Sequence, residues 1–177
     1  MSSHILPLEF FNRPTLEIMP TLLGKYLVRN EGAVLREGMV TEIEAYIGTE
    51  DKACHAAKGK TERTQVMFEP AGTWYVYLCY GMYWMLNIVT EAKDFPAAIL
   101  LRGLWQEGRH YDGPGKLTRY FEIDRSLNGK PATPASGLWF EDRGRSISAK
   151  AIQRAKRVGI AYAGKWQHKL WRYYIEV

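Results

Sequence analysis

The segment Thr73–Asn87, TWYVYLCYGMYWMLN, holds four of the chain's 11 tyrosines and two of its six tryptophans. Read with a period of two, it places Tyr75 and Tyr77 on one face of a strand and Trp74 and Val76 on the other. A strand built only for packing would use Val, Ile and Leu, because these side chains carry no hydroxyl that needs a hydrogen-bond partner. The tyrosine face therefore raises the question of a function beyond packing.

The dipeptide Tyr80-Gly81 interrupts this strand pattern. Because glycine permits a tight turn, we expect a hairpin with a first strand to about Cys79, a tip at Tyr80-Gly81 and a return strand through Asn87. An exposed tyrosine with Met82 beside it is unfavourable for solubility, but it suits a wedge or an interface. The alternative is a tyrosine that packs under a neighbouring loop.

A second strand pattern, VTEIEAYIG, covers residues 40–48. Alternation places Glu42, Glu44 and Tyr46 on one face with Val40, and an apolar set on the other, core face. One interpretation is a solvated sheet face whose charges pair across strands. The other is a catalytic carboxylate beside an aromatic wall, because a neighbouring glutamate or partial burial would raise one pKa toward the range of a general base.

The rest of the chain indicates short helices mixed with irregularly spaced strands. We expect a helical region within residues 14–24, a helical turn within 49–60, and a helix after the Gly-Pro-Gly-Lys loop. Further strands are expected within residues 25–30, 95–105 and 138–142 and near the C-terminus. The pattern predicts an α+β fold, a single domain over residues 1–177, rather than a repeating βαβ fold.

Composition narrows the class of protein. The net charge of +5 and the pI of about 9.2 favour a polyanionic partner. Cys54 and Cys79 form no Cys-x-x-Cys pair and are expected to be reduced, as in a cytoplasmic compartment. No signal peptide or membrane span is expected, and the four scattered histidines define no metal site by spacing.

Two loops could contact phosphate groups. The stretch Lys58–Phe68 is basic before it turns apolar, although such a charge run is more often a solvated loop. DGPGKL, residues 112–117, lacks the spacing of a Walker loop, but its glycines precede a helix and could present backbone N–H groups.

Several of these pieces occur together and in order with others: EIEAYIGTEDKACHA, MFEPAGTWYVYLCYGMYWMLNI, AAILLRGL, GPGKL and RVGIAYAGKW. From about Leu8 to the C-terminus the chain resembles the alkyladenine (3-methyladenine) DNA glycosylase family. The resemblance implies one α+β domain with a curved, mostly antiparallel sheet, surrounding short helices and a protruding hairpin. It also implies a monomeric, monofunctional enzyme, without a cofactor or lyase activity, in the cytoplasm or nucleoid, with a nuclear location not excluded. Its partner would be duplex DNA that contains alkylated or deaminated purines.

The resemblance assigns residues to the hydrolytic step. Glu44 matches the residue that activates the attacking water. Arg102 and the backbone carbonyl of Val158 match the other groups that hold this water. The sequence contains no lysine in the EIEAY block that could form a Schiff base.

The resemblance also implies residues that hold the flipped base. Tyr46, His55 and Tyr77 match the walls of the base pocket, and Asn87 matches a side chain that crowds the exocyclic amine of guanine. Stacked aromatic rings suit an alkylated, cationic purine through cation–π attraction, about 0.5–2 kcal/mol for each ring.

The remaining matches concern DNA. Tyr80, with Met82 beside it, matches the wedge that fills the gap left in the duplex, and Arg63 and Met67 match DNA-contacting positions. The chain departs from the family pattern at Thr64, where an asparagine is usual, in the short connection between residues 104 and 113, and in TRYFEI after GPGKL. We expect these departures to affect DNA affinity and lesion range.

Two other functions remain open at this stage. A non-catalytic nucleic-acid-binding module would keep the basic surface and the wedge, and would bind lesion DNA without releasing a base. A small-molecule-binding protein would use the tyrosines to line an ordinary ligand pocket, and tight, salt-sensitive duplex binding would argue against it.

Overall fold

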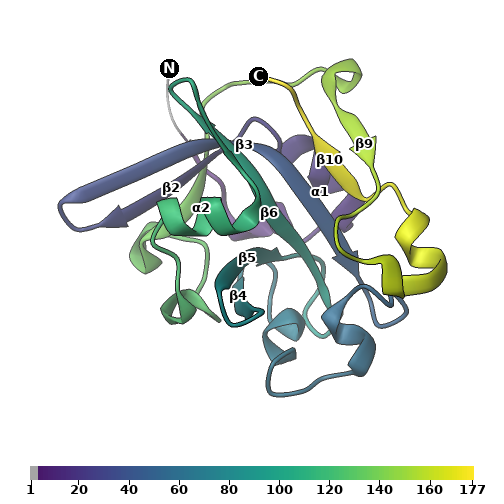
Figure 1. Ribbon diagram of the computed structural model, residues 1–177. Coiled ribbons are helices and arrows are strands. Elements are labelled where there is room, and N and C mark those ends of the chain that lie inside the picture. The colour runs from purple at the N-terminus through teal and green to yellow at the C-terminus, as the bar shows by residue number, and fades with distance from the viewer. Residues whose placement is uncertain (1–3) are drawn as a thin grey trace.

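The strand that carries EIEAY organises the sheet. The computed structural model describes residues 4–177, and in it β3 runs over 14 residues, Val34–Ile47. One edge of β3 pairs with β6 (Ala97–Gln106); the other pairs first with β2 (Tyr26–Glu31) and then with β10 (Arg172–Tyr174). Figure 1 shows the β2–β3 ribbon extending to one side and β10 lying beside the other half of β3.

All strand pairs that the structure describes are antiparallel, in the order β1-β8-β2-β3-β6-β5-β4. The further strands are β1 (His4–Ile5), β4 (Trp74–Cys79), β5 (Tyr83–Val89), β7 (Arg109–Asp112), β8 (Leu138–Asp142) and β9 (Gln153–Ala155). The helices are α1 (Thr15–Leu22) and α2 (Pro114–Tyr120), with 3₁₀ segments η1 (Leu8–Phe11), η2 (His55–Lys58), η3 (Gln65–Phe68), η4 (Arg125–Leu127), η5 (Pro134–Ser136), η6 (Ala149–Ala151) and η7 (Ala161–His168). The expected α+β class with a mostly antiparallel sheet is confirmed.

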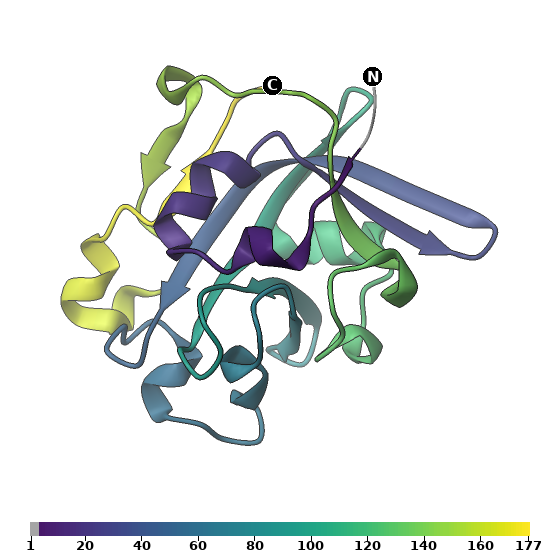
Figure 2. The same ribbon diagram turned by 180° about the vertical axis from the view of Figure 1, so that it is seen from behind.

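One large hydrophobic core lies under the sheet. In the view from behind, α1 and η1 cover this face (Figure 2). Their side chains Phe11, Met19 and Leu22 are fully buried with Trp74 and Phe140 from the strands. None of the described helices is long and apolar enough to cross a membrane.

The predicted alternation of β3 is wrong at one point. Val40 was expected on the face of Glu44, but it is fully buried in the core with Ile43 and Ala45. The reason is a bulge: the register against β6 shifts on both sides of Glu42, so the alternation restarts there. The interpretation of this face as solvated is wrong for Glu44, which is 0% exposed, although Glu42 does pair across strands with Arg102 and Arg172.

The predicted hairpin is confirmed as β4–β5. The N–H of Met82 donates to the carbonyl of Cys79 (3.1 Å), and the two residues between them, Tyr80 and Gly81, have φ of +51° and +68°. This is the φ pattern of a type I′ turn, for which Asn-Gly is the favoured sequence. Tyr80 is 88% exposed. A neighbouring loop therefore does not bury it, and the packing alternative is wrong.

The GPGKL motif supports this hairpin. Gly113, with φ of +99°, precedes α2, and a Cβ atom on Gly115 would lie 2.7 Å from the ring of Tyr83. The hydroxyl of Thr118 donates to the carbonyl of Trp84 (2.9 Å). Glycine at position 115 therefore lets α2 approach β5 closely, which gives the motif a packing role.

The short connection between residues 104 and 113 forms the β6–β7 hairpin, which the sequence analysis did not predict. Thr64, at the position where the resemblance implies an asparagine, is buried and holds its own loop: its hydroxyl donates to the carbonyl of Gly59 (2.8 Å). Both departures are thus accommodated by local structure.

Candidate active site

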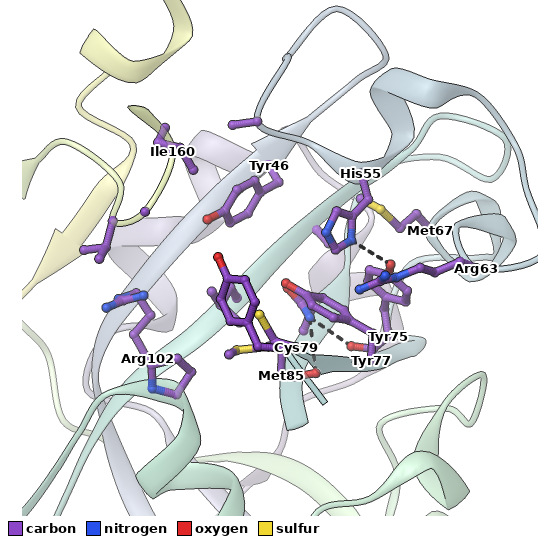
Figure 3. A pocket seen from close by; sticks show the side chains of 18 of the residues that line it. Tyr46, His55, Arg63, Met67, Tyr75, Tyr77, Cys79, Met85, Arg102 and Ile160 are labelled. Atoms are coloured by element: carbon purple, nitrogen blue, oxygen red, sulfur yellow. Dashed lines mark hydrogen bonds between the residues drawn. The ribbon is translucent and has the colours of Figure 1, made fainter. Parts of the chain in front are cut away.

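A cavity of about 510 Å³ opens between the β4–β5 hairpin and the segments that follow β3 and β9. Figure 3 shows Tyr46 and Ile160 on one side of it, His55, Tyr75 and Tyr77 on another, and Arg102 at a third. Strands β3, β4, β5 and β6 and several loops all contribute lining residues. The cavity is therefore assembled from segments far apart in the sequence.

Three rings form one wall. The centroid of the His55 ring lies 4.5 Å from that of Tyr77, and the Tyr75 and Tyr77 centroids are 5.2 Å apart. Tyr75 also lines the cavity, and its hydroxyl lies 3.0 Å from Nδ1 of His55. The shared strand face of Tyr75 and Tyr77 was the sequence signal for this position.

His55 is held neutral. Burial lowers its pKa to about 4, with help from the positive charges of Arg63 and Lys58. At neutral pH the wall therefore offers an uncharged imidazole, which a cationic ring can approach without repulsion.

The carboxylate of Glu44 lies beneath the cavity, fully buried. The hydroxyl of Tyr46 donates to Oε2 and the backbone N–H of Val158 donates to Oε1, each at 2.8 Å. Nε of Arg102 lies 3.5 Å from Oε1. Glu44 contributes no lining surface itself, but these three partners all line the cavity.

Burial raises the pKa of Glu44 above its usual 4.5; the charge of Arg102 and the hydrogen bonds from Val158 and Tyr46 oppose this rise. Glu42 shares the same nitrogen of Arg102: Nε donates to Oε1 of Glu42 (3.1 Å), and Arg172 donates to the same oxygen (3.0 Å). The site thus holds one fully buried and one partly exposed carboxylate, both close to Nε of Arg102.

Asn87 and Met67 both line the cavity and are almost fully buried. The Asn87 amide donates to the carbonyl of Tyr75 (3.0 Å), which fixes its orientation. Met67, expected to contact DNA, is 2% exposed within a small apolar cluster, so its side chain faces the cavity contents instead of the outer surface.

The predicted DNA-contacting residues Tyr80 and Arg63 stand at the cavity rim, and Met82 is exposed beside the tip. The guanidinium of Arg63 lies 5.2 Å from the ring centroid of Tyr77. Tyr162, on η7, also lines the rim and is 71% exposed, a position the sequence analysis missed.

Val158 was predicted to act through its carbonyl; in the structure its N–H contacts Glu44.

The chain is similar to known proteins over nearly its whole length. The family model described as Methylpurine-DNA glycosylase (MPG) matches residues 9–177. A protein of Methanocella arvoryzae is 44% identical, covering 96% of this chain and 92% of its own length. A protein of Legionella pneumophila strain Corby is 41% identical, covering 97% of this chain and 94% of its own length. A protein of Myxococcus xanthus is 42% identical, covering 96% of this chain and 89% of its own length. All three are named "Putative 3-methyladenine DNA glycosylase".

A match of this extent defines the class of protein, the DNA glycosylases of DNA repair. Within that class, the chain belongs to the methylpurine-DNA glycosylase family.

Proposed function

We propose that this protein flips alkylated or deaminated purines out of duplex DNA and hydrolyses the N-glycosidic bond with a water that Glu44 activates. The substrate class comprises 3-methyladenine, 7-methylguanine, hypoxanthine and ethenoadenine. The observation that carries the proposal is a fully buried carboxylate beneath an aromatic cavity, with Tyr46, Val158 and Arg102 arranged around it.

In this mechanism the base leaves with the electron pair of the C1′–N bond. The sugar takes on oxocarbenium character, which the negative charge of Glu44 stabilises. The water oxygen bonds to C1′ and its proton passes to Glu44, leaving an abasic site. Alkylated purines are electron-poor leaving groups, so the site needs little acid assistance. Arg102 limits the rise in the pKa of Glu44 and so favours the ionised carboxylate.

The cavity residues would select the base. The rings of His55, Tyr46 and Tyr77 would stack on a flipped purine, and the absence of charge on His55 favours a cationic one. Asn87, held by the Tyr75 carbonyl, would crowd the exocyclic amine of guanine.

The rim would bind the duplex. Tyr80 would occupy the gap left by the flipped nucleotide with Met82 beside it, offsetting part of the few kcal/mol that unstacking costs. We propose that the protein acts as a monomer and that Arg63 contacts the DNA near the cavity mouth.

The first expected result is a product analysis on a panel of duplexes that carry methylated adenine, hypoxanthine or ethenoadenine. Incubation is expected to give abasic sites that break only after alkali. Borohydride should trap no protein–DNA adduct, because none of the described residues lining the cavity is a lysine. Strand breaks without alkali, or a trapped adduct, would show lyase activity instead.

The second expected result is a pH dependence. Since the pKa of Glu44 is raised above 4.5 and that of His55 is lowered to about 4, Glu44 is the first of the two to be protonated as the pH falls. Single-turnover excision of a methylated purine, corrected for spontaneous depurination, should be lost on the acid side with a midpoint above 4.5. A rate that persists to pH 4.5 would contradict an essential Glu44 carboxylate.

A further inference from the structure

An ion pair that the proposed mechanism does not use lies next to the cavity. Nη1 and Nη2 of Arg157 donate to Oδ2 and Oδ1 of Asp51 at 2.5 and 2.9 Å. Both side chains are 0% exposed, which holds for no other salt bridge among residues 4–177. Asp51 follows β3, and Arg157 lies between β9 and η7, 106 residues later.

Arg157 makes further contacts with two backbone carbonyls and two aromatic rings. Nη1 of Arg157 also donates to the carbonyl of Ala45 (2.8 Å), and Nη2 to that of Trp166 (3.3 Å). Its guanidinium carbon lies 4.8 Å from the ring centroid of Tyr46 and 5.0 Å from that of Trp171. Arg157 therefore contacts both the end of β3, at Ala45 and Tyr46, and the C-terminal segment, at Trp166 and Trp171.

Asp51 orders its own loop. Its carboxylate accepts the N–H of Ala53 (3.0 Å) and that of Ile47 (3.4 Å). Ala53 lines the cavity, and His55 follows two residues later. The wall that carries His55 is therefore tied to the same carboxylate that binds Arg157.

These contacts surround Glu44. Ala45, whose carbonyl Arg157 binds, is the next residue after Glu44 in β3, and Val158, whose N–H binds Glu44, is the next residue after Arg157. The ring of Tyr46, whose hydroxyl donates to Glu44, packs against the same guanidinium. Two of the three groups that hold Glu44 are thus positioned directly by Arg157.

We propose that Asp51 and Arg157 are positioning residues for base excision, which keep the Val158 N–H and the Tyr46 hydroxyl on the Glu44 carboxylate. The inference rests on the proposed role of Glu44. A buried, bidentate pair suits this role because it permits one geometry, whereas a hydrophobic contact would let the segment slide.

The proposal predicts a defined change in the pH profile. The groups that face Glu44 are Tyr46 and Glu42 on β3, Arg102 on β6 and Tyr77 on β4, with Arg172 on β10 acting through Glu42. Since the Val158 and Tyr46 hydrogen bonds lower the pKa of Glu44, weakening them should raise it further. The loss of rate on the acid side of the pH profile, here called the acid limb, should then move to higher pH.

Asp51→Asn, which keeps the shape and removes the charge, is expected to lower the single-turnover rate at pH 7 by about 10–100-fold and to move the acid limb upward. Arg157→Lys, which keeps the charge but replaces the two donor nitrogens with one, is expected to have a smaller effect in the same direction. It serves as the second variant if Asp51→Asn does not fold. Rates are measured at least 15 °C below each variant's melting temperature.

The matched control is a second bidentate pair, none of whose residues lines the cavity. Arg143 donates to both carboxylate oxygens of Glu37 (2.8 and 2.7 Å) and its guanidinium lies 4.3 Å from the Tyr26 ring centroid. Arg143→Lys is expected to lower the melting temperature without moving the rate or the acid limb.

The outcomes separate the two proposals. If Asp51→Asn and Arg157→Lys lower only the melting temperature, as the control does, the pair is structural and the inference is overturned. If the wild-type protein releases no base from any duplex of the panel, the proposed function fails instead, whatever these variants do.

Discussion

Replacing Glu44 with glutamine is expected to lower base excision by about 10²–10⁴-fold while lesion-DNA binding is largely retained. An amide of the same shape keeps one acceptor oxygen, which can still take the Val158 N–H, and its NH2 group can donate to the Tyr46 hydroxyl oxygen, but it takes no proton from water and offers no negative charge to the sugar. Binding should persist because Glu44 lies beneath the cavity and contributes none of its lining surface.

This prediction is checked by single-turnover excision and by titration of a lesion duplex, on the wild type and the variant. Glu50→Gln is the matched control, because it makes the same change at an exposed residue just after β3. Glu44→Gln with normal turnover would remove Glu44 from the mechanism. Loss of binding together with turnover would show that the carboxylate holds the cavity open and not that it acts on water.

Replacing Tyr80 with asparagine should separate folding from function. Tyr80 has a φ of +51°, a conformation that costs a non-glycine residue roughly 1–2 kcal/mol and that asparagine tolerates better. Because the ring is 88% exposed, little packing is lost. The melting temperature should therefore stay the same or rise, while excision from duplex DNA falls by about tenfold or more as the wedge is lost.

The most discriminating measurement compares the excision rate on duplex DNA with that on single-stranded DNA, since only the duplex has a gap that must be filled. Tyr80→Phe keeps the ring and should retain most of the duplex activity. If Tyr80→Asn excises from duplex DNA at the wild-type rate, or loses single-stranded activity to the same extent, Tyr80 is not the wedge.

The hairpin and its two faces were predictable because they depend on local pattern. Period-two alternation separated Trp74 and Val76 from Tyr75 and Tyr77, and glycine after Tyr80 marked the turn. These signals lie within a few residues of one another, so the sequence shows them directly.

Features that depend on distant pairing were not predictable. The bulge near Glu42 arises from the pairing of β3 with β6, about 60 residues away, and it moved Val40 into the core. The ion pair of Asp51 with Arg157 joins positions 106 residues apart, and neither residue is unusual in its local context. The burial of Glu44 likewise depends on β6 and on the segment around Val158, which no local pattern brings together.

The alternation beside the bulge makes chain length, more than residue type, the constraint on this part of the protein. Val40 and Ile43 both face the core although three positions separate them, and Leu104 and Leu101, their partners on β6, do the same. The bulge supplies the extra residue that this spacing needs, whereas Ile43 and Ala45 follow plain alternation. Losing a residue between those two would turn one half of the strand over, without altering the chemistry of any remaining side chain. Within EIEAY and its partner strand, insertions and deletions should therefore be far less acceptable than substitutions.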